Sequence, residues 1–164
     1  MNIVEGDFSC TNYNFAVIVS KFNEVIGQKL LEGALACLKF AGCPDKNIDV
    51  IKVPGAFEIP LAAAKLAGLK KYNALICLGA VIRGETPHFE YVSGAVSSGI
   101  LKVSLKYNIP IGFGVLTTNN FEQALERSIE KVELKLEYSG KKTGNKGWDA
   151  ALTALEMVNL INKF

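Results

Sequence analysis

Residues 79–90 are the part of this sequence best suited to chemistry. They read Gly-Ala-Val-Ile-Arg-Gly-Glu-Thr-Pro-His-Phe-Glu, between an apolar, strand-like run at 74–78 and a helical pattern over 89–105. A strand that ends in a glycine-containing turn and opens a helix leaves several backbone N–H groups aimed at one point. Because the helix dipole adds partial positive charge there, the stretch predicts a site for a small anion such as a phosphate.

The only histidine, His88, falls on the first turn of this expected helix. An unperturbed imidazole titrates near pH ~6.5, so it can both give and take a proton. A lone histidine is more often a surface residue or a core residue whose hydrogen bonds are satisfied within the protein. The position of His88 beside an expected anion site favours a functional role instead. We therefore expect chemistry on a small phosphorylated molecule.

Three polar residues, Arg83, Glu85 and Thr86, surround Gly84 in the same turn. Thr86 could cap the helix and also face the anion. An ordinary capped helix with a surface arginine is an equally good interpretation of these residues taken alone.

The composition indicates a globular domain. The chain has 164 residues, of which 49% are hydrophobic and 21% charged, and we expect one domain over residues 1–164. The net charge of +2 argues against a nucleic-acid binder, which usually shows a concentrated basic face. No apolar run approaches the roughly 20 residues of a membrane span. The first residues show no signal-peptide pattern, so the cytoplasm is the expected location.

The four cysteines, Cys10, Cys37, Cys43 and Cys77, show no Cys-x-x-Cys spacing. Cys37 and Cys77 fall in apolar patterns and are expected to be small core residues. With one histidine in the chain, we expect no zinc site.

Strand-like and helical patterns alternate along the chain. Apolar runs of strand length lie at 15–19, 48–53, 74–78 and 111–116, and helical patterns follow at 24–40, about 59–69, 89–105, from 121 onward and 148–162. This alternation predicts an α/β fold, a flavodoxin-like three-layer sandwich with a central four-stranded parallel sheet, in preference to a longer Rossmann sheet. Residues 2–5 could add a short strand that pairs outside its own sheet, with a neighbouring subunit.

Ligands of open parallel sheets bind outside the carboxyl ends of the strands. Here those ends are the loops at 21–23, 54–58, 80–88 and 117–120. Phe22 and Phe57 could stack there on a flat heterocycle, or could seal the end of the core. Glu58 could accept hydrogen bonds from ligand hydroxyls, or only compensate a helix dipole, an effect of roughly 0.3–1 kcal/mol. Arg127 is expected to be solvated unless packing against a neighbour makes it a second phosphate ligand.

Six segments carry a resemblance to a known family. They are Lys-Phe-Asn at 21–23, Val-Pro-Gly-Ala-Phe-Glu-Ile-Pro at 53–60, Leu-Gly-Ala-Val-Ile-Arg-Gly-Glu-Thr-Pro-His-Phe at 78–89, Phe-Gly-Val at 113–115, Glu-Gln-Ala-Leu-Glu-Arg at 122–127 and Gly-Asn-Lys-Gly-Trp at 144–148. In this order, over nearly the whole chain, they resemble lumazine synthase. The resemblance implies condensation of 5-amino-6-(D-ribitylamino)uracil with 3,4-dihydroxy-2-butanone 4-phosphate to 6,7-dimethyl-8-ribityllumazine, a step of riboflavin biosynthesis that needs no metal and no organic cofactor.

The resemblance also implies roles for matching positions. Phe22 would stack on the pyrimidine, and Phe113 would reach the site from the adjacent subunit, since family sites lie between protomers of a homopentamer. His88 would be the proton donor and acceptor. The residues that would hold the ribityl chain and the ring edge are Ala56, Phe57, Glu58, Ala80, Val81 and Ile82, with Lys146 and Asp149 matching positions near the ribityl side. The residues that would bind the phosphate are Glu85 and Thr86, largely through backbone N–H groups, and the cationic Arg127.

One segment departs from the family pattern. The link from Arg127 to the Gly-Asn-Lys-Gly turn is short in the family, whereas residues 128–143 fill it here. Apolar spacing from Phe121 predicts that the helix continues to about Tyr138, although alternation over 132–138 leaves a strand open. Family pentamers meet at this link in icosahedral shells, so we expect a free pentamer or a decamer in preference to a capsid.

Two other functions fit parts of the sequence. One is a riboflavin synthase of the archaeal type, which has a related fold. The other is a non-catalytic lumazine- or flavin-binding shell protein. The intact segments around Phe57 and His88 favour the synthase over the first, and the presence of both His88 and Arg127 speaks against the second.

Overall fold

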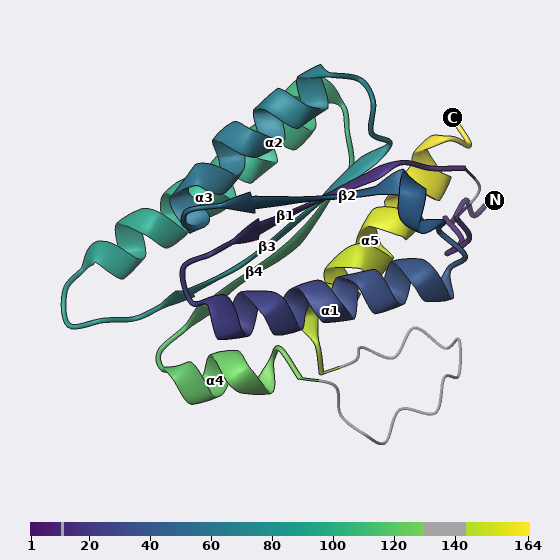
Figure 1. Ribbon diagram of the computed structural model, residues 1–164. Helices are drawn as coiled ribbons and strands as arrows, with labels where there is room; N and C mark the ends of the chain where they lie inside the picture. The colour runs from purple at the N-terminus through teal and green to yellow at the C-terminus, as the bar shows by residue number, and fades with distance from the viewer. Residues whose placement is uncertain (11, 130–143) are drawn as a thin grey trace.

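The computed structural model describes residues 1–10, 12–129 and 144–164, and its centre is a four-stranded sheet (Figure 1). All strand pairs are parallel, and the spatial order is β2-β1-β3-β4. The sheet confirms the expected flavodoxin-like α/β fold. The strands are β1 (Phe15–Ser20), β2 (Ile48–Val53), β3 (Ala74–Ile82) and β4 (Ile111–Thr118).

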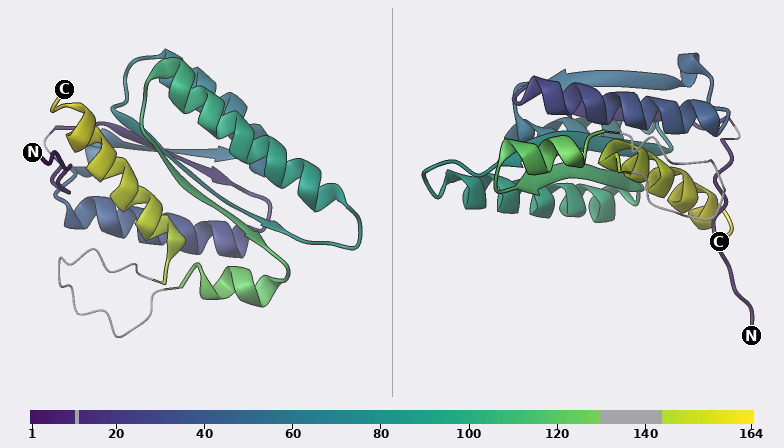
Figure 2. Two further views of the ribbon diagram at one scale, coloured as in Figure 1. Left: turned by 180° about the vertical axis from the view of Figure 1, so that it is seen from behind. Right: turned by 90° about the horizontal axis from the view of Figure 1, so that it is seen from below.

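Helices cover both faces of the sheet and complete a three-layer sandwich (Figures 1 and 2). On one face α1 (Glu24–Phe40) packs against α5 (Lys146–Ile161), with the short α4 (Phe121–Glu126) nearby. On the other face α2 (Ile59–Gly68) packs against α3 (His88–Tyr107). Two short 3₁₀ helices, η1 (Asp45–Asn47) and η2 (Ala56–Glu58), lie in the connections. None of the helices in the described ranges is both long enough and apolar enough to span a bilayer.

The apolar core is divided by the sheet into two clusters. In the central strand β1, Phe15 and Val17 face the α1–α5 layer, while Ala16 and Ile18 face the α2–α3 layer. Both sides of the strand are therefore buried, which explains its continuous apolar sequence. Cys37 lies in the first cluster and Cys77 in the second, as free thiols, which confirms their expected place in the core.

Two strands are longer than the sequence pattern predicts. The predicted strand at 74–78 continues to Ile82, and the strand at 111–116 continues to Thr118. The extra residues pair in register, from Gly79 with Val115 to Ile82 with Thr118. Residues 79–82 and 117–118, which the sequence analysis placed in loops, therefore belong to strands and extend the sheet toward its carboxyl edge.

The helix predicted to run from Phe121 to about Tyr138 ends at Glu126 instead, which corrects that prediction. The carbonyl groups that would continue it are taken by the start of α5: Lys146 N–H donates to Arg127 at 2.8 Å, and the amide of Asn145 donates to Ser128 at 2.7 Å. Tertiary contacts thus override the helical spacing. Residues 130–143, including the alternative strand at 132–138, lie outside the described residues.

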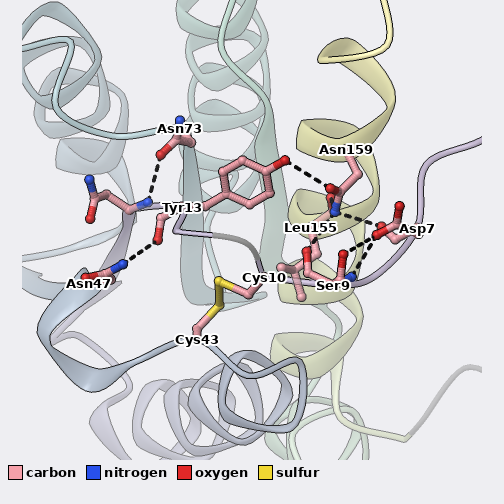
Figure 3. Close-up of a disulfide and its surroundings, with 10 residues drawn as sticks. Asp7, Ser9, Cys10, Tyr13, Cys43, Asn47, Asn73, Leu155 and Asn159 are labelled. Carbon is pink, nitrogen blue, oxygen red and sulfur yellow. Dashed lines mark hydrogen bonds between the residues drawn. A yellow bond between two sulfur atoms is a disulfide. The ribbon is translucent and has the colours of Figure 1, made fainter.

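The N-terminal segment is fastened to the amino edge of the sheet by contacts that the sequence analysis did not predict (Figure 3). A disulfide joins Cys10 to Cys43, with a Cα–Cα distance of 5.2 Å. The amide of Asn159 donates to the carbonyl groups of Asp7 and Ser9 at 3.0 and 2.9 Å. Residues 2–5 form no strand within this chain, and their pairing with a neighbouring subunit stays a prediction.

Candidate active site

A cavity of about 640 Å³ opens at the carboxyl edge of the sheet, where the loops after β1, β2 and β3 meet. Its volume suits a small organic molecule. Three aromatic side chains, Phe22, Phe57 and Tyr91, stand in its wall with most of their surface exposed. The edge therefore offers an apolar recess where the topology rule places a ligand.

Nine of the predicted site residues line this cavity, and they come from four separate segments. The structure therefore brings together predicted site residues that follow β1, β2 and β3 or stand at the start of α3. The nine are Phe22, Ala56, Phe57, Glu58, Ala80, Val81, Ile82, Thr86 and His88.

The loop after β1 presents Phe22 to the cavity. The N–H of Phe22 donates to the carbonyl of Pro54 at 3.0 Å, which ties this loop to the loop after β2. Asn23 follows in the left-handed conformation, with φ of 59°, and its side-chain amide donates to the carbonyl of Ala80 at 2.9 Å. This conformation is uncommon outside glycine, and asparagine tolerates it best. Asn23 thus connects the loop after β1 to strand β3, next to Phe22, whose side chain is 71% exposed.

The loop after β2 is short and enters a helix directly. Ala56–Glu58 form η2, which leads into α2 with Pro60 in the first turn, where its missing N–H does no harm. The ring of Phe57 is exposed while Ala56 is buried. Glu58 makes no capping hydrogen bond to α2, so its carboxylate oxygens are available to a ligand at the cavity wall.

The expected anion site lies at the start of α3. The helix begins at His88, which is exposed and borders the cavity together with Thr86. The residue at the cap position is Pro87, and no side chain caps the helix, so the predicted capping role of Thr86 is wrong. Uncapped N–H groups at this end remain available to an anion.

Arg83 flanks this site and is paired within the protein. Its guanidinium forms an ion pair with Glu90 and lies over the ring of Phe89, 4.4 Å from the centroid. The hydrogen bond from Arg83 holds the pKa of Glu90 below its usual value. The charge of Arg83 is therefore compensated before any ligand arrives.

Four predicted site residues lie away from the cavity of the single chain. Glu85 sits in the loop between Thr86 and Arg83, but does not line the cavity. Arg127, at the end of α4, donates from Nη1 to the carbonyl of Gln123 at 2.9 Å. Phe113 is 47% exposed on β4, a strand at the edge of the sheet.

The fourth is Lys146, which lies on the other layer of the sandwich. It occupies the first turn of α5, and its Nζ pairs with Asp149 Oδ2 at 2.7 Å. Asp149, the other residue matched to the ribityl side, is held in that ion pair as well. The single chain therefore brings neither residue to the recess.

Sequence reasoning passed over three residues that line the cavity. Tyr91 and Val92 follow His88 by one helical turn, and this spacing alone puts them on the same face of α3. Asn23 appears in the sequence analysis only as the last residue of the segment Lys-Phe-Asn at 21–23, without a role of its own. Its left-handed conformation before a helix is the signal that could have indicated a structural role.

The strand order, the recess at the carboxyl edge and the helix start beside a histidine define a flavodoxin-like α/β protein that binds a small ligand at its strand ends. Residues 12–162 match the family described as 6,7-dimethyl-8-ribityllumazine synthase. A 6,7-dimethyl-8-ribityllumazine synthase of Clostridium kluyveri is 52% identical over 163 residues, which cover 99% of both chains. One of Desulfatibacillum aliphaticivorans is 53% identical over 162 residues, covering 99% of this chain and 97% of the relative.

The chain therefore belongs to the 6,7-dimethyl-8-ribityllumazine synthase family. It is an enzyme of riboflavin biosynthesis, a transferase that condenses 5-amino-6-(D-ribitylamino)uracil with 3,4-dihydroxy-2-butanone 4-phosphate and releases phosphate and water. These matches support neither the riboflavin synthase nor the non-catalytic shell protein considered above.

Proposed function

We propose that the condensation takes place in the recess at the carboxyl edge of the sheet. The observation that carries this proposal is the convergence of nine residues from separate loops on one cavity of about 640 Å³. Phe22 stacks on the pyrimidine ring, and Phe57 and Glu58 hold the ribityl chain. Ala80, Val81 and Ile82 follow the ring edge with their backbone groups, because β3 ends beneath the recess.

The phosphate of the second substrate binds at the start of α3. Its oxygens accept from backbone N–H groups of Glu85 and Thr86, at the positive end of the helix dipole. Phosphate is the leaving group, so an anion site here favours its departure as charge develops on it. The exposed imidazole of His88 lies beside the same helix start and borders the cavity.

His88 moves protons during the condensation. The amine of the pyrimidine adds to the ketone, water and phosphate leave, and the ring closes. Each of these steps requires a proton to be given or taken, and general acid–base help typically contributes about 10²–10⁴-fold. Much of the remaining acceleration comes from holding both substrates in one recess.

The site is completed by a neighbouring protomer of a homopentamer. Phe113, Arg127 and Lys146 do not line the recess of their own chain, yet Phe113 and Arg127 are exposed. An exposed aromatic ring on an edge strand is suited to a subunit contact. Phe113 of one protomer would then cover the recess of the next, and Arg127 would pair with the phosphate there.

The experiment mixes both substrates with the purified protein and follows lumazine fluorescence. We expect product from the wild-type chain. Arg127→Ala should raise the KM for the phosphorylated ketone by about 10–100-fold, because a hydrogen bond to a charged group contributes about 1.5–3 kcal/mol. The KM for the pyrimidine should change little. Equal effects on both substrates would contradict a role at the phosphate.

Residues 1–164 act as one domain, and the pentamer remains free or pairs into a decamer. The length of the link at 128–143, where family shells make their contacts, supports this assembly. Five chains of 17.7 kDa give about 88 kDa. A particle on the order of a megadalton in sedimentation or light scattering would show a closed shell and contradict the proposal.

The cytoplasm is the location that we propose for the enzyme. Its substrates are small polar metabolites, which agrees with that location. The Cys10–Cys43 disulfide argues against a cytoplasmic location, because reducing compartments such as the cytoplasm keep most thiols free. Alkylation of free thiols in freshly lysed cells, followed by mass spectrometry, would show which form the chain takes there.

A further inference from the structure

Arg83 occupies a position from which it can hold the phosphate loop in place. It is the first residue beyond β3, and its backbone N–H donates to the carbonyl of Thr118 at 2.9 Å, which extends the pairing with β4 by one residue. The backbone of Arg83 is therefore fixed by the sheet. The loop at 84–87 begins immediately after this fixed point.

The side chain of Arg83 contacts two different segments. Its Nη1 donates to Glu90 and its guanidinium lies over Phe89, both on the first turn of α3. Its Nε donates to Asn119 Oδ1 at 3.2 Å, in the turn between β4 and α4. One guanidinium thus joins the start of α3 to the turn that precedes α4.

The residues enclosed by this contact are those assigned to the phosphate and to proton transfer. Glu85, Thr86 and His88 all lie between Arg83 and Glu90. Within the described chain, no side chain of the loop at 84–87 makes a hydrogen bond, and the start of α3 has no side-chain cap. The loop is consequently held at its two ends, and the contact between Arg83 and Glu90 joins those ends.

A chain of hydrogen bonds continues from Arg83 toward Arg127. The backbone N–H of Asn119 donates to Gln123 Oε1 at 2.9 Å, and Arg127 Nη1 donates to the Gln123 carbonyl at 2.9 Å. The loop and Arg127 of one chain, which are expected to bind phosphate in two neighbouring recesses, are thus both linked to the same turn.

We propose that Arg83 is a positioning residue of the condensation, which orients the phosphate loop through Glu90, Phe89 and Asn119 and does not itself touch the substrate. This inference rests on the proposed phosphate site. Its physical basis is that a guanidinium offers several donors in a fixed plane and can also stack on a ring, so that one side chain can fix several partners. Neutralisation by Glu90 leaves Arg83 poorly suited to be the phosphate ligand.

Steady-state kinetics of Arg83→Ala, with each substrate varied separately, tests this role. We expect the KM for the phosphorylated ketone to rise about tenfold, the equivalent of ~1.4 kcal/mol of binding. The KM for the pyrimidine and the melting temperature should change little, because an exposed ion pair contributes little to global stability. Arg83→Lys should restore part of the loss, because lysine keeps the charge but neither the planar donors nor the stacking. Equal losses for both substrates would overturn the proposal.

Glu90→Gln separates positioning from direct binding. If Arg83 acts through Glu90, this variant raises the KM for the phosphorylated ketone, and combining it with Arg83→Ala adds little to the loss. If Arg83 binds the phosphate directly, removal of its counter-charge lowers that KM, and the proposal fails. Glu90→Gln also carries the test if Arg83→Ala does not fold.

Lys71→Ala is the matched control. Lys71 also forms an exposed ion pair, with Asp49, and also lies over a ring, 5.0 Å from the centroid of Tyr72. It sits at the amino edge of the sheet, far along the strands from the recess. We expect both KM values of this variant to equal those of the wild type.

A binding measurement distinguishes failure of the inference from failure of the phosphate site. The single histidine gives one labelled imidazole signal, and inorganic phosphate should shift it in the wild type. Arg83→Ala should need about tenfold more phosphate for the same shift. If the wild type is active but phosphate does not shift its imidazole signal, both the proposed phosphate site and this inference are wrong. A response of Arg83→Ala equal to the wild type would overturn the inference alone.

Discussion

At the amino edge of the sheet the chain is fastened to itself, whereas at the carboxyl edge it leaves large apolar rings in solvent. The amino edge carries the Cys10–Cys43 disulfide and the hydrogen bonds of Asn159 (Figure 3). At the carboxyl edge Phe22 is 71% and Phe57 60% exposed, and the loop at 84–87 is held only at its ends. The two edges lie at opposite ends of the strands in Figure 1.

This difference separates the parts of the molecule that stabilise the fold from those that bind. Exposed rings contribute little to the stability of a free chain, because they bury little apolar surface. They become useful when a substrate or a neighbouring protomer covers them. Substitutions at the carboxyl edge should therefore change activity with little effect on melting, and substitutions at the amino edge should do the reverse.

The largest expected effect is at His88. His88→Ala should lower kcat by about 10²–10⁴-fold without abolishing turnover, because proton transfer is lost while both substrates are still held together. Since the side chain is exposed, the melting temperature should stay the same. Stopped-flow fluorescence across a pH series measures the rate. A variant with wild-type rates at every pH would remove His88 from the mechanism.

The disulfide should show the opposite behaviour. Cys10→Ser opens a link between residues 33 apart and should cost about 2–4 kcal/mol, or roughly 4–16 °C in melting temperature. Dithiothreitol should lower the melting temperature of the wild type by a similar amount and leave a Cys10→Ser/Cys43→Ser double variant unchanged. The kcat of either variant should match the wild type. A wild-type melting temperature that ignores the reductant would show that the bond does not form.

Asn159 should have a smaller effect at the same edge. Its Nδ2 donates to the carbonyls of Asp7, Ser9 and Leu155, and its Oδ1 accepts from the Tyr13 hydroxyl at 3.0 Å. Asn159→Ala removes these bonds and takes the side-chain donor away from the carbonyls of Asp7 and Ser9, so it should cost about 1–3 kcal/mol. Proteolysis of the N-terminal segment should become faster in this variant. An unchanged melting temperature together with unchanged proteolysis would mean that water replaces the amide at no cost.

The sequence predicted the layers of the fold and most of the recess. Both follow from local patterns: apolar runs of strand length, helical spacing, and the rule that ligands meet parallel strands at their carboxyl ends. The ends of elements were harder to predict. Gly79 and Thr117 resemble turn residues, but pairing between β3 and β4 keeps them in the sheet.

The remaining errors concern contacts between residues far apart in the chain. The end of α4 is set by Asn145, whose side-chain amide donates to the carbonyl of Ser128. The spacing of apolar residues after Phe121 cannot predict a hydrogen bond to a residue so far along the chain. Cys10 and Cys43 lie in unrelated segments, so only the folded chain brings them together. Phe113 and Arg127 do not line the recess of their own chain, and their place in the recess of a neighbouring protomer stays a prediction.

The smallest expected effect is at Asp49, and its pH dependence identifies its source. Two hydrogen bonds to its carboxylate hold the pKa of Asp49 below its usual value. The one from Lys71 has the larger effect, and the one from the Tyr72 hydroxyl, at 2.7 Å, has the smaller. Because the folded pKa lies below the unfolded value of about 3.9, the stabilisation is fully present above that value and is lost as the pH falls through the folded pKa. Asp49→Asn should therefore lower the melting temperature near pH 7 by no more than about 2–4 °C, since the side chains of Lys71 and Asp49 are 57% and 44% exposed and an exposed ion pair contributes little.

The difference between Asp49→Asn and the wild type should shrink in high salt and vanish at acid pH, where the wild-type carboxyl is also neutral. Melting curves from about pH 7 to about pH 2 measure this. A difference that persists at acid pH would assign the effect to packing of the β2 edge instead of charge. Glu90 is an exposed carboxylate paired in the same way, and its pKa is lowered for the same reason. If loss of the Glu90 charge changes substrate binding while loss of the Asp49 charge changes only melting, two chemically similar ion pairs serve different purposes because they lie at opposite edges of one sheet.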